Sequence, residues 1–78
     1  MLSQTKKRIS NNGLKPNLTR REYDVLVGIS EELTTQQISE KLFISPKTVE
    51  THRMNIMSKL GAKNSVGIIK IAMEKQLL

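Results

Sequence analysis

Apolar residues recur along this chain at the three- and four-residue spacings of helices that are buried on one side. The first such stripe consists of Val25, Leu26, Ile29 and Leu33. Just before it, Thr19 and Glu22 have the spacing of a capping box, in which each side chain satisfies a free backbone N–H of the other residue. The pattern predicts a first helix over residues 19–31, with Gly28 as a weak point inside it.

A short second helix is expected next, because Ile38 and Leu42 lie four positions apart and can face inward together. Its N-cap is either Thr34 or Thr35, since both are residue types that accept a hydrogen bond from the first helical turn. The pattern therefore predicts a helix that ends near residue 42.

A third helix is marked at both of its ends. Ser45 and Pro46 are a typical N-cap followed by proline at the first helical position. Gly61 fits the left-handed residue that ends many helices. Between these signals the sequence predicts a helix over residues 46–60.

A fourth helix is expected over about residues 64–75, and it is apolar on nearly every side. One side can pack on the core, and the remainder is predicted to form an interface between two copies of the chain. The predicted dimer residues are Val66, Ile68, Ile69, Ile71 and Met73. The alternative is that the N-terminal segment covers them.

The elements predict one all-α domain over residues 18–78, a compact four-helix bundle, since no segment carries a strand pattern. Residues 1–17 are polar and contain Asn-Asn-Gly and a proline, so we expect them to be a linker or a flexible tail.

Composition narrows the class of protein. The chain has 78 residues and no cysteine, which excludes disulfides and thiolate metal sites. No apolar run is long enough for a membrane span, and no secretory signal is present, so we expect a cytoplasmic protein with no membrane partner. His52 stands alone, and no nucleophile–base pair or glycine-rich phosphate loop occurs. We predict no cofactor, no metal and no enzymatic activity.

The distribution of charge indicates what kind of partner the chain could bind. The net charge is +6, and residues 41–63 hold five lysines and arginines against the single acid Glu50. A basic segment of this kind favours a polyanionic partner, although charge alone is equally compatible with a solvated surface.

The second and third helices, joined by a short turn, form a helix-turn-helix candidate in which the third helix would enter the DNA major groove. With Val49, Ile56 and Leu60 buried, the opposite face carries the residues predicted to read bases, which are Glu50, Thr51 and Met54. Residues predicted from their chemistry to hold phosphates are Lys47, Arg53 and Lys59, with Thr34, Thr35 and Gln36 at the start of the second helix. Each has a structural alternative: Glu50 can pair with a neighbouring cation, and Met54 can fill a gap in the core.

The sequence also resembles a known family, the LuxR/FixJ-type (GerE or NarL type) helix-turn-helix domain. The resemblance covers residues 18–78 and is carried by "LTRREYDVL" and "LTTQQISEKLFISPKTVETHRMNIMSKLG". It implies a four-helix DNA-binding domain of a bacterial transcriptional regulator, commonly the output domain of a response regulator in a two-component system. Such domains dimerise through the fourth helix.

The resemblance also implies roles for single residues. These roles agree with those assigned above from the buried and exposed faces of the third helix, and they add further residues. The family's base-reading positions fall on Glu50, Thr51 and Met54. Its phosphate-holding positions fall on Thr35, Gln36, Lys47, Thr48, His52, Arg53 and Lys59.

The chain departs from the family pattern at several positions. Gly28 stands where a large aliphatic residue is usual, Glu32 where glycine is usual, and Glu50 where lysine is usual. Ala62 and Ser65 stand where valine and arginine are usual, which predicts a less firmly tied start of the fourth helix. These departures leave the fold unchanged and predict an altered base preference.

Two other functions remain open from the sequence. One is a module similar to the promoter-binding domain of a sigma factor (region 4), which also contacts RNA polymerase and need not dimerise. The other is a helical protein-interaction module whose basic surface is incidental.

Overall fold

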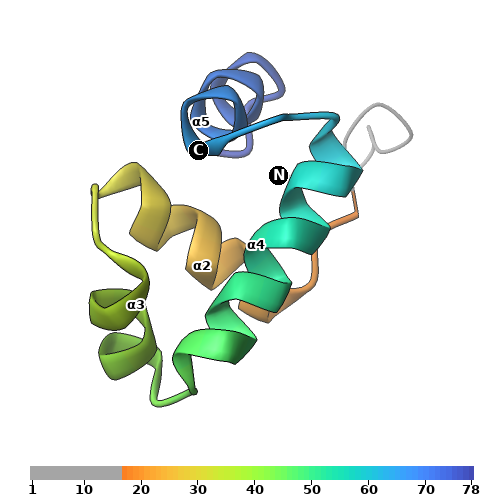
Figure 1. The fold of residues 1–78 in the computed structure, drawn as a ribbon. Coiled ribbons are helices and arrows are strands. Elements are labelled where there is room, and N and C mark those ends of the chain that lie inside the picture. Colours follow the sequence, from red (N-terminus) through yellow and green to blue (C-terminus); the bar gives the residue numbers. More distant parts are fainter. Residues whose placement is uncertain (1–16) are drawn as a thin grey trace, which may run out of the picture.

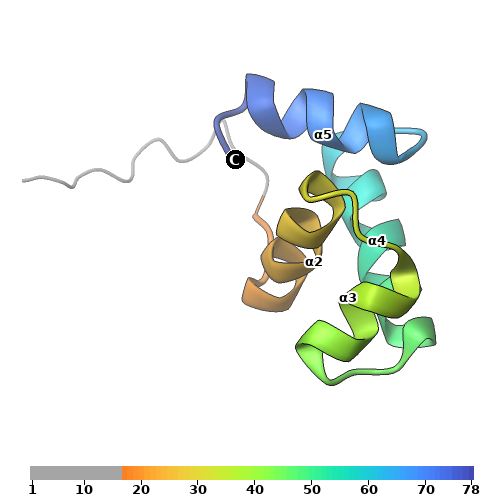
Figure 2. The ribbon, with the colours of Figure 1, turned by 90° about the vertical axis from the view of Figure 1, so that its left-hand side faces the viewer.

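The computed structural model describes residues 17–78, and the predicted tail lies almost wholly outside these residues. The described chain forms four helices, α2 (Arg20–Ser30), α3 (Thr35–Leu42), α4 (Pro46–Leu60) and α5 (Ser65–Glu74). Helix α4 runs through the middle of the domain and contacts α2, α3 and α5 (Figure 1). Seen from the side, α5 lies across one end of the bundle, opposite the α3–α4 turn (Figure 2). The prediction of an all-α four-helix bundle is confirmed.

The helix starts are set by local side chains, as the sequence indicated. In α2, the backbone N–H of Glu22 donates to Thr19 Oγ1 at 3.1 Å, and the N–H of Thr19 donates to Glu22 Oε1 at 3.0 Å. A second capping box joins Thr34 and Gln37, so Thr34 is the cap of α3. These reciprocal bonds satisfy backbone donors that a helix start otherwise leaves free.

The start and end of α4 also match their sequence signals. Ser45 caps it by accepting a hydrogen bond from the N–H of Thr48, and Pro46 occupies the first helical position. Gly61 ends it in the left-handed region, with a φ of 72°. At the start of α5, Asn64 accepts from the N–H of Gly67. Each of these capping residues therefore lies at the helix end that it was expected to start or stop.

Three residues with side chains adopt the left-handed conformation at turns, and the third of them is Gln76, with a φ of 60° after α5. Glu32 has a φ of 63° after α2, and Phe43 a φ of 59° after α3. The bend at Phe43 lets the N–H of Ile44 bond to the carbonyl of Ser39 and redirects the chain into α4. Phe43 is 94% exposed, so its ring contributes almost nothing to the core.

The core is built from all four helices. Its buried apolar residues are Val25, Leu26, Ile38, Val49, Ile56, Leu60, Ile68 and Ala72. Gly28 is buried beside them, and a Cβ atom there would lie 2.8 Å from Ile38 Cγ1. The glycine therefore allows α2 to approach α3 closely, which accounts for one departure from the family pattern. None of the helices in residues 17–78 is long and apolar enough to cross a membrane.

Candidate nucleic-acid interface

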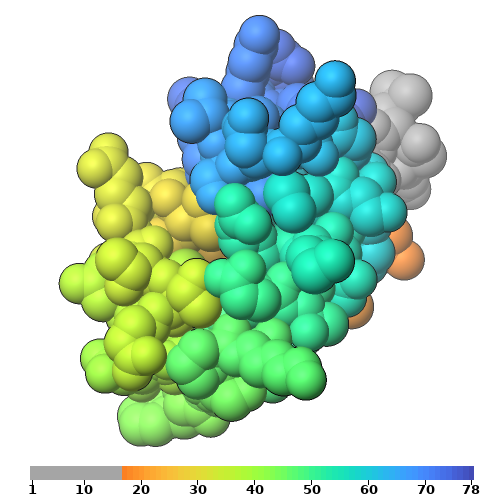
Figure 3. Space-filling view, viewed as in Figure 1, coloured from red at the N-terminus to blue at the C-terminus, as the bar shows by residue number. Residues whose placement is uncertain are grey.

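One face of α4 is open to solvent along its length. Its exposed residues Lys47, Thr51, Met54 and Ser58 follow one another at four- and three-residue spacings and therefore form one stripe, which we call the α4 stripe. Met54 is 62% exposed, so it does not fill a gap in the core. The stripe begins beside the α3–α4 turn, and Figure 3 shows α4 at the surface between α3 and α5. Thr51 and Met54, two of the predicted base readers, lie in it together.

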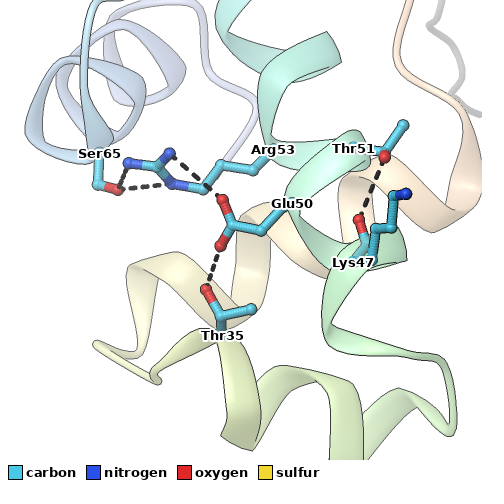
Figure 4. A network of polar contacts seen from close by, with 6 residues as sticks. All are labelled: Thr35, Lys47, Glu50, Thr51, Arg53 and Ser65. Atoms are coloured by element: carbon cyan, nitrogen blue, oxygen red, sulfur yellow. Dashed lines mark hydrogen bonds and ion pairs between the residues drawn. The ribbon is translucent and has the colours of Figure 1, made fainter.

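Glu50, the third predicted base reader, is half-buried beside the stripe and is turned toward α3. The Thr35 hydroxyl donates a hydrogen bond to Glu50 Oε2. On the same helix, Arg53 Nη1 lies 4.0 Å from Glu50 Oε1. Figure 4 shows the carboxylate between Thr35 and Arg53, whereas Lys47 and Thr51 lie on another side of α4. The structure thus brings Glu50, Thr35 and Arg53 together, but as partners of one another.

Arg53 continues this network to α5. Its Nε and Nη2 atoms both donate to Ser65 Oγ, at 3.1 Å and 2.7 Å. Although Ser65 predicted a less firmly tied start of α5, its hydroxyl is held there by the guanidinium from α4. A chain of side-chain contacts from Thr35 through Glu50 and Arg53 to Ser65 therefore links α3, α4 and α5.

Lys59, predicted to hold phosphate, has its charge engaged inside the domain. Its ammonium lies 2.7 Å from Glu22 Oε1 and donates to the carbonyl of Asn17 at 3.1 Å. Burial raises the pKa of Glu22, but the hydrogen bonds from Lys59 and from the Thr19 N–H, with the charges of Lys59 and His52, outweigh it and leave the pKa lowered. A buried carboxylate needs this cation, so we propose that Lys59 serves the fold instead of holding a phosphate, although its side chain is still 35% exposed.

The remaining predicted phosphate residues differ in accessibility. Lys47 is exposed on the first turn of α4, and Gln36 is exposed on α3, where its amide donates to Glu40. The Thr48 hydroxyl lies 2.9 Å from that of Ser45. His52 is half-buried, and its Nδ1 atom has no hydrogen-bond partner within residues 17–78. Of these residues, Lys47 and Gln36 are the most open to a ligand.

The fourth helix divides its apolar residues between two faces. Ile68 is completely buried, so its assignment to a dimer interface is wrong: it belongs to the core of the single chain. Ile69 and Ile71 are half-buried against that core. Val66 and Met73 are 79% and 63% exposed. With Ile69 between them at helical spacing, they form an apolar strip on the outer side of α5.

An open groove of about 1000 Å³ runs beside this strip. Residues from the α2–α3 turn, α3, α4 and α5 line it, among them Leu33, Glu50, Arg53, Ile69 and Met73. The polar network therefore stays accessible to solvent from the groove side.

Sequence reasoning missed Asn55 as a candidate. Asn55 is exposed next to the α4 stripe, four positions after Thr51. That spacing was visible in the sequence and places an amide donor and acceptor beside the predicted base readers.

The geometry defines a class of protein, the helix-turn-helix domain. Its second helix is α4, which presents the exposed α4 stripe, and its first helix is α3, which packs against another side of α4. Residues 16–72 match the sequence model of a protein family, the luxR family of bacterial regulatory proteins. The chain belongs to this family, whose domains of this type bind DNA and are not enzymes.

Similar proteins agree with this assignment. The oxygen regulatory protein NreC of Staphylococcus aureus is 43% identical over 61 residues, which cover 78% of this chain and 28% of NreC. The response regulator ChrA of a heme-sensing two-component system superposes with a TM-score of 0.77 at 38% identity, covering 82% of this chain and 32% of ChrA. The Vibrio cholerae VqmA dimer, a LuxR-type receptor, gives 0.78 at 30% identity, with coverages of 85% and 30%. The chain thus spans under a third of each relative.

Proposed function

We propose that this domain binds specific duplex DNA as a homodimer, with α4 in the major groove. The observation that carries the proposal is the α4 stripe: Thr51 and Met54 are exposed together on a helix capped at both ends, and Lys47 stands at its leading turn. A major groove about 12 Å wide admits one helix, and a threonine or methionine side chain can contact a thymine methyl group.

Phosphate contacts would come from either side of the stripe. Lys47 supplies a charge at the start of α4, and Gln36 supplies an amide from α3. Thr48 and His52 are half-buried on the side of α4 away from Glu50, and we retain them as weaker candidates. Such contacts position a domain on DNA without reading its sequence.

The dimer contact is assigned to the outer strip of α5. In the dimer, the exposed side chains of Val66 and Met73 would be buried against the partner copy. Ile69 and Ile71, which are already half-buried, would contact the partner at the edge of this interface. The comparison with VqmA supports a dimer as such, since that protein is described as a dimer in the absence of its target DNA. Two copies would then place two α4 helices on successive half-sites about one helical turn apart.

The role of a whole protein containing this domain is proposed from the relatives. ChrA is a response regulator of a two-component system, and NreC is a regulatory protein. We propose that the domain is the output part of such a cytoplasmic transcriptional regulator. Contact with RNA polymerase would be a further step of that role.

Selection of duplexes from a random pool, followed by affinity measurements over a series of salt concentrations, tests the proposal. We expect a paired half-site to be enriched and the logarithm of the binding constant to fall linearly with the logarithm of the salt concentration. Salt-independent binding, or no enrichment, would contradict it.

The mass of the DNA complex in solution separates the alternatives. A single copy bound to one half-site would favour the monomeric sigma-like module. Val66→Glu and Met73→Glu should abolish dimers while leaving weak single-site binding. A stable dimer without duplex affinity at low salt would favour a protein-interaction module.

A further inference from the structure

Glu50 occupies an unusual position relative to the α4 stripe. It lies three residues after Lys47 and four before Met54, so its backbone borders the stripe. Its carboxylate nevertheless accepts the Thr35 hydroxyl and faces the guanidinium of Arg53 (Figure 4). Arg53 is in turn fixed by two hydrogen bonds to Ser65.

The physical reason for this arrangement is the charge of the carboxylate. A free carboxylate at this site would be repelled by the phosphates of a polyanion, unless it accepted a hydrogen bond from a cytosine amino group. The Thr35 hydroxyl and the Arg53 cation both satisfy the carboxylate within the domain, on the side of α4 that faces the groove beside α5.

We propose that Glu50 is a specificity-determining positioning residue, held out of the DNA interface by Thr35 and by an Arg53 fixed to Ser65. We call these four residues the Glu50 latch. Because of the latch, Thr51 and Met54 contact the bases, whereas Glu50 does not impose a preference for cytosine. It also fixes the first turn of α3 and the first turn of α5 against α4. This inference rests on the proposed DNA-binding function.

The latch makes an asymmetric prediction about two variants. In Glu50→Ala no carboxylate remains to be released, so the rank order of bound duplexes should stay that of the wild type. Affinity for all duplexes should rise about threefold, because one negative charge is removed from the neighbourhood of the DNA phosphates. In Thr35→Val the carboxylate loses its hydroxyl partner, so preference at one or two base pairs should change about tenfold.

The experiment measures pool selection and affinity at one stated salt concentration for the wild type, Glu50→Ala, Thr35→Val and the double variant. The double variant should regain the wild-type rank order, because the released group is gone. Thr35→Ser, which keeps the hydroxyl, should behave as the wild type. Glu40→Ala is the matched control, since Glu40 is an exposed carboxylate on α3 with no contact to the latch residues; it should leave the rank order unchanged.

The outcomes separate the two roles of Glu50. If Glu50→Ala changes the rank order while Thr35→Val does not, Glu50 reads a base directly and the latch is refuted. A Thr35→Val profile equal to the wild type also refutes it. If the wild type selects no duplex, the proposed function fails. Unfolding temperatures of the wild type, the two single variants and the double variant test the contact between Thr35 and Glu50. Additive effects of the two substitutions would show that no latch exists.

Discussion

The ammonium nitrogen of Lys59 lies 2.7 Å from Oε1 of Glu22, although the two residues stand 37 positions apart. This ion pair joins the last turn of α4 to the first turn of α2. Because the Glu22 side chain is 5% exposed and also closes the capping box with Thr19, one carboxylate serves both local and long-range structure.

Replacing Lys59 by methionine should therefore destabilise the domain. The substitution leaves the buried carboxylate without its cation, and we expect a loss of about 2 kcal/mol in the free energy of unfolding, measured by chemical denaturation. Lys41→Met is the control, because Lys41 pairs with Glu31 at an exposed site and should cost less than about 0.5 kcal/mol. Equal losses in the two variants would contradict the structural role of Lys59.

Acid should remove the contribution of Glu22. Its pKa is lower in the folded domain than the ordinary value of 4.5, so the carboxylate stabilises the fold fully above that value. This stability is lost as the pH falls through the lowered folded pKa. Thermal unfolding from about pH 6 to about pH 3 should show a weaker pH dependence in Glu22→Gln than in the wild type. Identical pH profiles would show that another group controls acid unfolding.

Two glycine substitutions should have opposite effects. Gly28→Ala places a Cβ atom 2.8 Å from Ile38 Cγ1 and should destabilise the domain by about 1–3 kcal/mol, despite the better helix propensity of alanine. Gly67→Ala meets its nearest atoms at 3.5 Å, an ordinary contact, and should stabilise α5 by roughly 0.5–1 kcal/mol. Denaturation midpoints that move in the same direction would contradict the close approach of α2 and α3.

Lys47 and Lys59 should differ in their effect on DNA binding. Lys47→Gln removes a proposed phosphate contact, so affinity should fall for every duplex and the salt slope should become shallower by about 0.9. Lys59→Met should leave that slope unchanged, provided that binding is measured where the variant is folded. A shallower slope for Lys59→Met would return that residue to the DNA interface.

Local signals were read correctly from the sequence because their partners lie within one helical turn. The Thr19–Glu22 capping box, the Ser45–Pro46 start and the Gly61 stop all fall where they were predicted. Thr34 and Thr35 could not be separated, since each fits an N-cap. The structure assigns the cap to Thr34, and Thr35 contacts Glu50, which is 15 residues away.

The sequence could not show contacts between distant parts of the chain. Lys59 was predicted to hold phosphate because nothing in the sequence shows that Glu22 is buried beside it. Ile68 was predicted at an interface because the apolar pattern of α5 covers almost the whole circumference. Only the packing of α5 on the other helices distinguishes Ile68, which is buried, from Val66, which is exposed.

The hydrogen bond from Lys59 to the carbonyl of Asn17 has a consequence for how the domain can be carried by a larger regulator. The polypeptide joins the bundle beside the last turn of α4, whereas Lys47 stands on the first turn, about 18 Å away at 1.5 Å per residue. The attachment point and the leading tip of the helix are thus at opposite ends of one rod. A module connected ahead of Asn17 would therefore join the domain at the end of α4 that is farther from Lys47.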